Sequence, residues 1–187
     1  ILINTARKEV INEPELIVQL KDPRRREQAF TRLVREYQEP IYWQIRRMVN
    51  SHDDADDILQ NTFLKAWTAL EAFRGESKLS TWLFRIATNE TLNHLNKEKS
   101  TQSIDDVSNT GIQLQSDTYF DGDETQIQFQ QALSTLPPKQ RAVFDMKYFQ
   151  EMKYEEISQI MGTSIGALKA SYHHAVKKIT EYFDRLH

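Results

Sequence analysis

The sequence contains no cysteine. This absence excludes disulfide bonds, thiolate zinc sites and cysteine nucleophiles, and it fits a reducing cytoplasm. Long apolar runs are also missing, so we expect neither a membrane span nor a signal peptide in these 187 residues. The chain starts at Ile1 instead of methionine, so further residues are expected ahead of it in the natural protein.

No part of the chain is strongly basic. Residues 1–97 carry 15 basic and 14 acidic side chains, and residues 129–187 carry 8 and 6. Residues 98–128 carry 1 basic and 7 acidic side chains, so the whole acidic excess lies in the middle. A nucleic-acid-binding protein usually has a clear basic patch. Charge therefore gives only weak support for such a function.

Strand-like alternation is absent as well. Apolar residues recur instead at helical spacing, in stripes over residues 30–37, 41–49, 55–70 and 79–87. Pro40 fits the first turn of a separate helix, where its missing N–H costs nothing. Ser77 or Ser80 is expected to cap the helix that starts near Leu79. The pattern predicts an all-α fold.

The helical pattern disappears between residues 98 and 125. This stretch is rich in Ser, Thr, Asp, Gln and Asn and has no apolar stripe. Such a composition is typical of a flexible, acidic linker. We therefore predict two small helical domains, at 1–97 and 126–187, joined by a linker at 98–125.

The segment Tyr154–Ala175 holds two short helical patterns on either side of Gly162. A glycine that can take a positive φ angle is what a helix-turn-helix needs there. The second helix has a core-facing seam, and its other face is made of small polar residues. Short side chains let a helix approach DNA bases closely. A helical hairpin with a small-residue packing face explains the spacing equally well.

Two adjacent histidines, His173 and His174, lie on this helix. Neighbouring residues on a helix point about 100° apart, and no further ligand lies nearby in the sequence. We therefore expect no metal site there, and nothing in the sequence indicates a cofactor.

Two longer stretches resemble a known family. The first half contains DDADDILQNTFLKAWTALEAFRGESKLSTWLFRIATNETLNHL, which closely resembles region 2 of bacterial sigma-70 factors. The second half contains LSTLPPKQRAVFDMKYFQEMKYEEISQIMGTSIGALKASYHHAVKKI, which is similar to their region 4. With an acidic linker between the two and no region 3, the order resembles the extracytoplasmic-function group.

The resemblance implies a non-enzymatic subunit that binds core RNA polymerase, recognises two promoter elements and helps melt the downstream one. It also implies an anti-sigma factor as a partner, often membrane-anchored, and no small-molecule substrate. A polymerase-binding helix is implied near residue 56. Its residues are Asp53, Asp56, Asp57, Gln60, Asn61 and Phe63. Helix capping alone explains two of the acids, and Phe63 and Trp67 suit a core equally well, Trp67 especially.

The implied DNA-binding residues fall into three groups. The loop Phe73, Arg74, Gly75, Glu76 and Ser77 captures a flipped base of the downstream element, as loops do with unstacked bases. Ser80, Thr81, Arg85, Asn89 and Asn93 are expected on the exposed face of the next helix. Trp82 suits a buried anchor or a stacking platform.

The third group reads the upstream element from the last helix. It consists of Thr163, Ser164, Gly166, Ala167, Lys169, Ala170, Ser171, His173 and His174. Family members commonly carry arginines here, whereas this chain has Ser171 and His174 at those positions. The upstream sequence that it recognises is therefore not implied by the resemblance.

Other functions remain open from the sequence. Asp53, Asp54 and Asp57 match the aspartate-rich pattern of isoprenoid synthases, which requires a second acidic cluster across a deep cavity. A helix-turn-helix regulator would use only residues 129–187 on DNA. An adaptor would bind polymerase without reading DNA. A test of polymerase binding distinguishes a sigma factor from the plain regulator, and a test of promoter-specific initiation distinguishes it from the adaptor.

Overall fold

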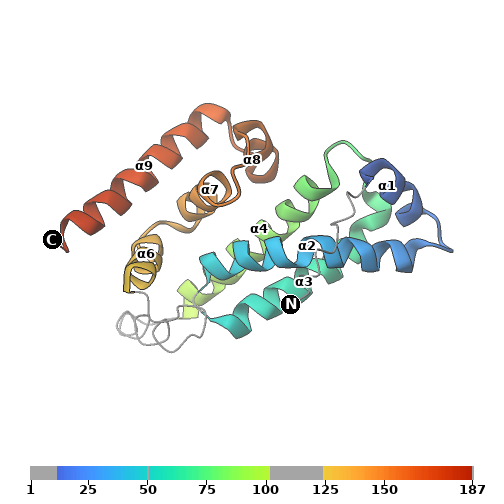
Figure 1. Cartoon of the computed structure of the whole chain (residues 1–187), viewed down its shortest axis with the longest axis horizontal. Coiled ribbons are helices and arrows are strands. Elements are labelled where there is room, and N and C mark those ends of the chain that lie inside the picture. Colours follow the sequence, from blue (N-terminus) through green and yellow to red (C-terminus); the bar gives the residue numbers. More distant parts are fainter. Residues whose placement is uncertain (1–11, 50, 102–123, 187) are drawn as a thin grey trace, which may run out of the picture.

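The computed structural model describes residues 12–49, 51–101 and 124–186, and every regular element in these ranges is a helix. The helices are α1 (Glu13–Lys21), α2 (Arg26–Met48), α3 (His52–Ala69), the short 3-10 helix η1 (Leu70–Ala72), α4 (Leu79–Thr101), α6 (Glu124–Ser134), α7 (Pro138–Tyr148), α8 (Tyr154–Met161) and α9 (Ile165–Asp184). The prediction of an all-α fold is confirmed (Figure 1). Among these helices, none combines the length and the apolar character that crossing a membrane requires.

Helix α2 corrects the expected break at Pro40. Pro40 lies inside one continuous helix of 23 residues instead of starting a second one. A proline within a helix removes one backbone hydrogen bond. Leu33, Ile41 and Ile45 are fully buried on both sides of it, so core packing holds the helix together across the proline.

The start of α4 also differs from expectation. The helix begins at Leu79, so Ser80 lies inside it, and the Ser77 hydroxyl donates to the carbonyl of Lys78. The side chain of Glu13, from α1, accepts the hydrogen bond of the Leu79 N–H. A carboxylate at a helix N-terminus is favoured by the helix dipole. The cap of α4 is therefore supplied from a distant part of the chain.

The second half contains the predicted helix-turn-helix. Gly162 ends α8 with φ of 65°, in the left-handed region that glycine reaches without strain. The Ser164 hydroxyl caps α9 by accepting from the N–H of Ala167 at 3.3 Å. Leu168, Ala175 and Ile179 are buried on the core-facing side of α9, whereas Leu186, beyond the end of the helix, is exposed.

The two helical halves pack directly against each other. Helix α8 lies against α4, and α7 contacts α2 (Figure 1). One hydrophobic cluster contains residues of both halves, including Leu79 and Leu83 of α4 together with Ile157 and Ile160 of α8. Helix α4 runs to Thr101 and α6 starts at Glu124, so both ends of the expected linker are helical, and residues 102–123 lie outside the described ranges.

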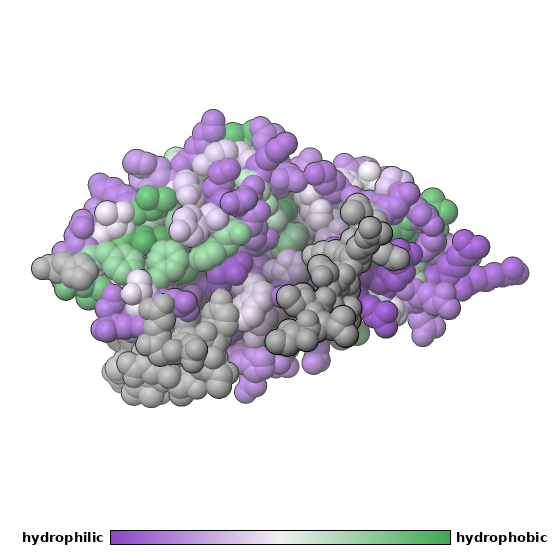
Figure 2. All heavy atoms as spheres, in the orientation of Figure 1, coloured by the Kyte–Doolittle hydropathy of each residue, from purple (hydrophilic) through white to green (hydrophobic). Residues whose placement is uncertain are grey.

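A second, smaller cluster belongs to the second half alone. It joins α6, α7 and α9 through Leu133, Phe144 and Ile179, with Phe129 and Phe183 packed against it. Figure 2 shows apolar side chains gathered over this end of the molecule, while the opposite end is mostly hydrophilic. The second half therefore has its own core in addition to the core that it shares with the first half.

Candidate polymerase and DNA interfaces

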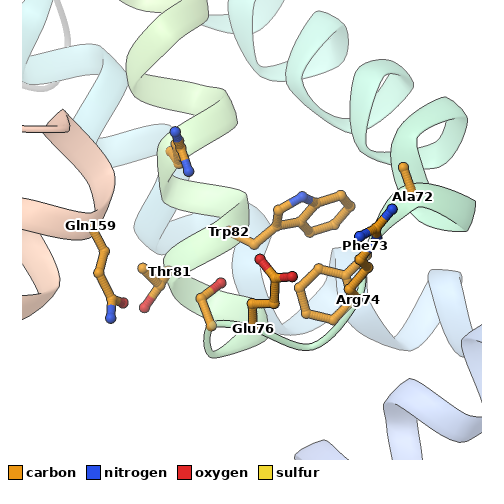
Figure 3. Close-up of a pocket in the computed structure, with 9 residues that line it drawn as sticks. Ala72, Phe73, Arg74, Glu76, Thr81, Trp82 and Gln159 are labelled. Carbon is orange, nitrogen blue, oxygen red and sulfur yellow. The ribbon is translucent and has the colours of Figure 1, made fainter.

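A pocket of about 460 Å³ lies where the loop between η1 and α4 meets the start of α4. The residues that line it are Ala72, Phe73, Arg74, Glu76, Ser77, Thr81, Trp82, Arg85 and Gln159. Figure 3 shows the Trp82 ring and the Phe73 ring along one side of it and Gln159 approaching Thr81 from α8. The structure thus brings most of the loop residues together with Thr81, Trp82 and Arg85 of α4.

Phe73 is the loop residue that departs most from an exposed stacking group. It is only 6% exposed and belongs to the main hydrophobic cluster. Its ring centroid lies 5.0 Å from that of Trp82 at an interplanar angle of 45°. Trp82 is half-buried and packs against the same cluster while lining the pocket, so it serves as an anchor and as a pocket wall.

Arg74, Gly75 and Glu76 are the exposed part of the loop. Gly75 has φ of 74°, a conformation that a side chain would strain. It turns the backbone back toward α4 and leaves the guanidinium of Arg74 and the carboxylate of Glu76 at the pocket. The pocket therefore combines aromatic walls with one charge of each sign at the loop.

The expected exposed face of α4 is only partly exposed. Arg85, Asn89 and Asn93 are exposed and Ser80 is half-buried, but Thr81 is 5% exposed. The expectation for Thr81 was wrong, because α8 lies over this end of α4 and brings Gln159 next to it (Figure 3). Gln159 lines the pocket from far along the sequence, and no local pattern indicates it.

On α3, the predicted polymerase-binding residues separate by burial. Asp53, Asp57, Gln60 and Asn61 are exposed. Asp56 is half-buried, and its carboxylate lies 3.2 Å from the His52 imidazole. The helix begins with the Ser51 hydroxyl accepting from the N–H of Asp54 at 3.3 Å. At the acidic start of α3, Asp53 and Asp57 are therefore the acids most exposed to solvent.

A core position was open to both Phe63 and Trp67 from the sequence, and to Trp67 especially, but the structure buries Phe63 and leaves Trp67 partly exposed. Phe63 is buried in the main cluster. Trp67 is 37% exposed, and the guanidinium of Arg26 lies 5.0 Å from its ring centroid. Leu64 is 64% exposed on the same face as Asp57 and Asn61. Leu64 follows Asn61 by three positions, and residues at this spacing share a helix face. This spacing could have identified Leu64 as an apolar residue on the predicted polymerase-binding surface.

The face of α9 that is predicted to read DNA is open to solvent. Ser164, Gly166, Ala167, Lys169, Ala170, His173 and His174 are exposed, and Thr163 and Ser171 are half-buried. A Cβ added to Gly166 would meet no atom within 4 Å. This excludes, within the described residues, a packing face of small residues between two helices. The ammonium of Lys169 lies 5.8 Å from the ring centroid of Tyr154, which places it on the α8 side of that face.

One group of side chains in the described ranges has the spacing of metal ligands. Asp54, His94 and Glu98 place one ligand atom each within 4.8 Å of one another, all three half-buried. No metal site was expected here. The His94 imidazole lies 3.5 Å from a Glu98 oxygen and 3.8 Å from an Asp54 oxygen, and these distances also fit an ion pair between a protonated histidine and the two carboxylates. Asp53 and Asp57 are not part of the group, so the aspartate-rich pattern does not assemble around it.

Comparison with known proteins finds a separate family match for each half of the chain. Residues 33–101 match the family description Sigma-70 region 2, and residues 126–179 match Sigma-70, region 4. The ECF RNA polymerase sigma factor SigW of Bacillus subtilis is 33% identical over 156 residues, which cover 78% of this chain and 83% of that protein. The RNA polymerase sigma-H factor of Pseudomonas aeruginosa is 30% identical over 158 residues, covering 76% and 79%.

A solved structure shares the fold. The sigma factor RpoE in complex with the anti-sigma factor NepR from Bartonella quintana superposes with a TM-score of 0.67 at 24% identity. The match covers 83% of this chain and 96% of that one. Together with the region 2 and region 4 matches, the identity to SigW shows that the chain belongs to the extracytoplasmic-function group of the sigma-70 family, the non-enzymatic sigma factors of RNA polymerase.

Proposed function

We propose that this sigma factor acts in the cytoplasm and helps to open promoters by capturing one unstacked base of the downstream element in the pocket beside Phe73 and Trp82. The observation that carries the proposal is the pocket itself, whose volume lies within the range of small-ligand sites. Loops with aromatic walls read bases once these have left the duplex.

The pocket chemistry supports a nucleobase as the ligand. Trp82 and Phe73 provide apolar surface for a planar ring. The carboxylate of Glu76 can accept hydrogen bonds from an exocyclic amino group, and the guanidinium groups of Arg74 and Arg85 can bind the phosphates on either side. Arg85 and Asn89, one turn apart on the exposed face of α4, extend this surface along the single strand.

Two further surfaces complete the proposed function. On α3, Asp53, Asp57, Gln60 and Asn61 with the exposed Leu64 form a surface that suits a basic partner with an apolar centre, which we assign to core polymerase. On α9, the exposed small-residue face reads the upstream element in a major groove. We also infer an anti-sigma partner, as RpoE has in its complex with NepR.

The test compares duplex and pre-melted templates. We expect Arg74→Ala to bind core polymerase normally but to lose permanganate reactivity of the downstream element on duplex promoters. A bubble template should restore most of the activity, because melting is then no longer required. Phe73→Leu keeps the buried wall apolar and should show the same pattern more weakly. A stacked base is worth about 1–3 kcal/mol.

Arg35→Ala is the matched control, since it removes the same charge from an exposed position of α2. It should behave like the unmodified protein on both templates. An equal loss of activity by Arg74→Ala on duplex and bubble templates would contradict base capture during melting.

A further inference from the structure

Three side chains with metal-ligating atoms meet where α3 begins and α4 approaches its end (Figure 1). Asp54 lies in the first turn of α3, and His94 and Glu98 lie one turn apart on the same face of α4. Each residue offers one ligand atom, and the three atoms lie within 4.8 Å of one another. All three side chains are half-buried. The group therefore joins two helices of the first half through one nitrogen and two oxygen ligands.

The distances within this group fit a bound cation. Two ligand atoms that each lie about 2.0–2.2 Å from a tetrahedral zinc ion are about 3.3–3.6 Å apart. The Nε2 atom of His94 lies 3.5 Å from a Glu98 oxygen and 3.8 Å from an Asp54 oxygen. The first distance falls inside that interval, and the second exceeds it only slightly, so a small rotation of the Asp54 side chain removes the difference. One cation can therefore contact all three atoms without a change in either helix.

A second observation points to the same position. The Nε2 atom of His94 is buried from solvent and has no hydrogen-bond partner among the described residues. Donor and acceptor atoms of an N–H···O hydrogen bond are about 2.7–3.2 Å apart, so even a protonated imidazole would donate to neither carboxylate at the observed distances. A buried polar atom without a partner is unfavourable, and two carboxylates beside each other repel. A divalent cation that binds the neutral imidazole and both carboxylates relieves both effects.

We propose that Asp54, His94 and Glu98 bind a divalent transition-metal ion of the zinc type, which clamps the start of α3 to the end of α4. The two carboxylates balance the charge of the ion. The imidazole favours zinc and its first-row neighbours over Mg²⁺ and Ca²⁺, which prefer oxygen ligands alone. Three protein ligands leave a tetrahedral ion one position for water. The proposed role is to hold the two helices together, and it does not depend on the assignment of α3 to polymerase.

The metal ion alone is the probe for the test. Protein prepared without a histidine tag is treated with EDTA, dialysed and titrated with Zn²⁺ by isothermal titration calorimetry. We expect one tight site per chain, and His94→Gln should weaken binding at least about tenfold, because loss of even an outer-shell partner typically costs about 10–100-fold in affinity. The matched control is His52→Gln, which removes an exposed histidine at the same end of α3 that pairs with Asp56, outside the group. It should bind Zn²⁺ like the unmodified protein.

Two further measurements report the ligands independently of the calorimetry. The chain contains five histidines, so NMR of protein with ¹⁵N-labelled histidine can follow each imidazole. Zn²⁺ should shift the Nε2 signal that is missing in His94→Gln and leave the His52 signal in place. Zn²⁺ should also raise the melting temperature of the unmodified protein and of His52→Gln, because an ion that binds only the folded state stabilises it. Asp54→Asn and Glu98→Gln should reduce this rise, since each variant removes one ligand.

Several outcomes would overturn the proposal. Equal Zn²⁺ affinity of His94→Gln and the unmodified protein removes the site, as does an unchanged His94 signal when Zn²⁺ is in excess. Equal weakening by His52→Gln and His94→Gln would mean that Zn²⁺ binds scattered surface groups as an adventitious ion only. Mg²⁺ that binds as tightly as Zn²⁺ would contradict the proposed class of metal. A loss of stability in His94→Gln in EDTA, with no response of the unmodified protein to Zn²⁺, would make the group an ion pair and not a metal site.

Discussion

The two predicted DNA-reading surfaces are built in opposite ways. The downstream site is a loop that rests on the main core, with Phe73 buried and α8 lying over Thr81. The upstream site is one face of α9, with Gly166 and Lys169 open to solvent. In the first site, the residues that are expected to contact DNA also hold the fold together. In the second, the fold depends on the opposite face of the helix.

This difference has a consequence for how each site tolerates change. A substitution of Phe73 or Trp82 is expected to alter packing and binding together, because both residues pack with the main hydrophobic cluster and line the pocket. A substitution on the exposed face of α9 is expected to alter binding and to leave the core packing intact, because Leu168, Ala175 and Ile179 carry that packing. If the two sites act as proposed, upstream specificity can change through surface substitutions, whereas substitutions of the buried pocket residues also affect stability.

The largest expected effect tests this contrast through stability. Phe73→Ala removes a buried aromatic ring and should lower the free energy of unfolding by about 3–5 kcal/mol. Ala170→Gly, at an exposed interior position of α9, should lower it by only about 1 kcal/mol. Urea unfolding followed by circular dichroism measures both. Similar losses for the two variants would mean that the loop is not part of the core.

A second contrast concerns binding to core polymerase. Asp56→Arg combined with Asp57→Arg reverses two charges of the α3 surface and should abolish co-purification with core enzyme at unchanged helical content. Disrupting a buried interfacial charge pair typically costs about 2–5 kcal/mol. Because Asp56 already contacts His52, most of the loss should come from Asp57.

Asp184→Arg, an exposed acid at the end of α9, is the control for that measurement. It should leave polymerase binding unchanged, and the single variant Asp57→Arg should reproduce most of the effect of the double variant. Full co-purification of the double variant would contradict the assignment of this surface.

Much of the second half could be predicted from the sequence. The spacing of Ile157, Ile160 and Leu168 and the position of Gly162 are local signals, and helical periodicity alone determines which face of α9 stays exposed. The first half was less predictable. Burial of Thr81 depends on a helix more than seventy positions further along the chain, and the cap of α4 comes from Glu13.

Local rules also failed where packing decided between two allowed outcomes. Pro40 fits a first turn as well as a tolerated interior position, and only the buried stripe of α2 selects the second. Phe63 and Trp67 lie one turn apart on α3, so either of them could face the core. The packing against Phe30, whose ring lies 6.4 Å from Phe63 and 5.0 Å from Trp67, leaves Trp67 at the rim.

A third prediction concerns the exposed face of α9. Lys169 lies at its edge beside Tyr154, so Lys169→Ala should weaken binding to all upstream sequences and lower the slope of binding against salt by about 1. Ser171→Ala or His174→Ala should instead change the preferred sequence, at about 1–3 kcal/mol on the best site. Selection from randomised upstream elements at two salt concentrations measures both. A changed preference in the Lys169 variant alone would mean that another face of the helix reads the bases.

The smallest expected effect lies at Glu156, in the contact between the two halves. Its carboxylate accepts from the N–H of Lys153 at 3.0 Å and pairs with Lys78 across the halves. The hydrogen bond from Lys153 is the main reason that the pKa of Glu156 lies below its ordinary value of 4.5, and Lys78 adds to this lowering while partial burial opposes it. A lowered pKa in the folded state means that the stabilisation is present above 4.5 and is lost as the pH falls through the lower, folded value.

Glu156→Gln should therefore be less stable than the unmodified protein at neutral pH, and the difference should shrink as the pH falls below about 4.5. Exposed ion pairs contribute about 0–1 kcal/mol. The difference in unfolding free energy at neutral pH should therefore be the sum of a contribution in that range and the contribution of the weakened cap of α8. Glu155→Gln removes a charge from an exposed position of the same turn and serves as the control. If the unfolding free energies of the two glutamine variants differ from the unmodified protein equally at every pH, Glu156 has no special contact with Lys153 or Lys78. A difference of unchanged size in the Lys78→Ala background would assign the whole effect to the cap of α8 and would mean that the ion pair with Lys78 contributes nothing to the contact between the halves.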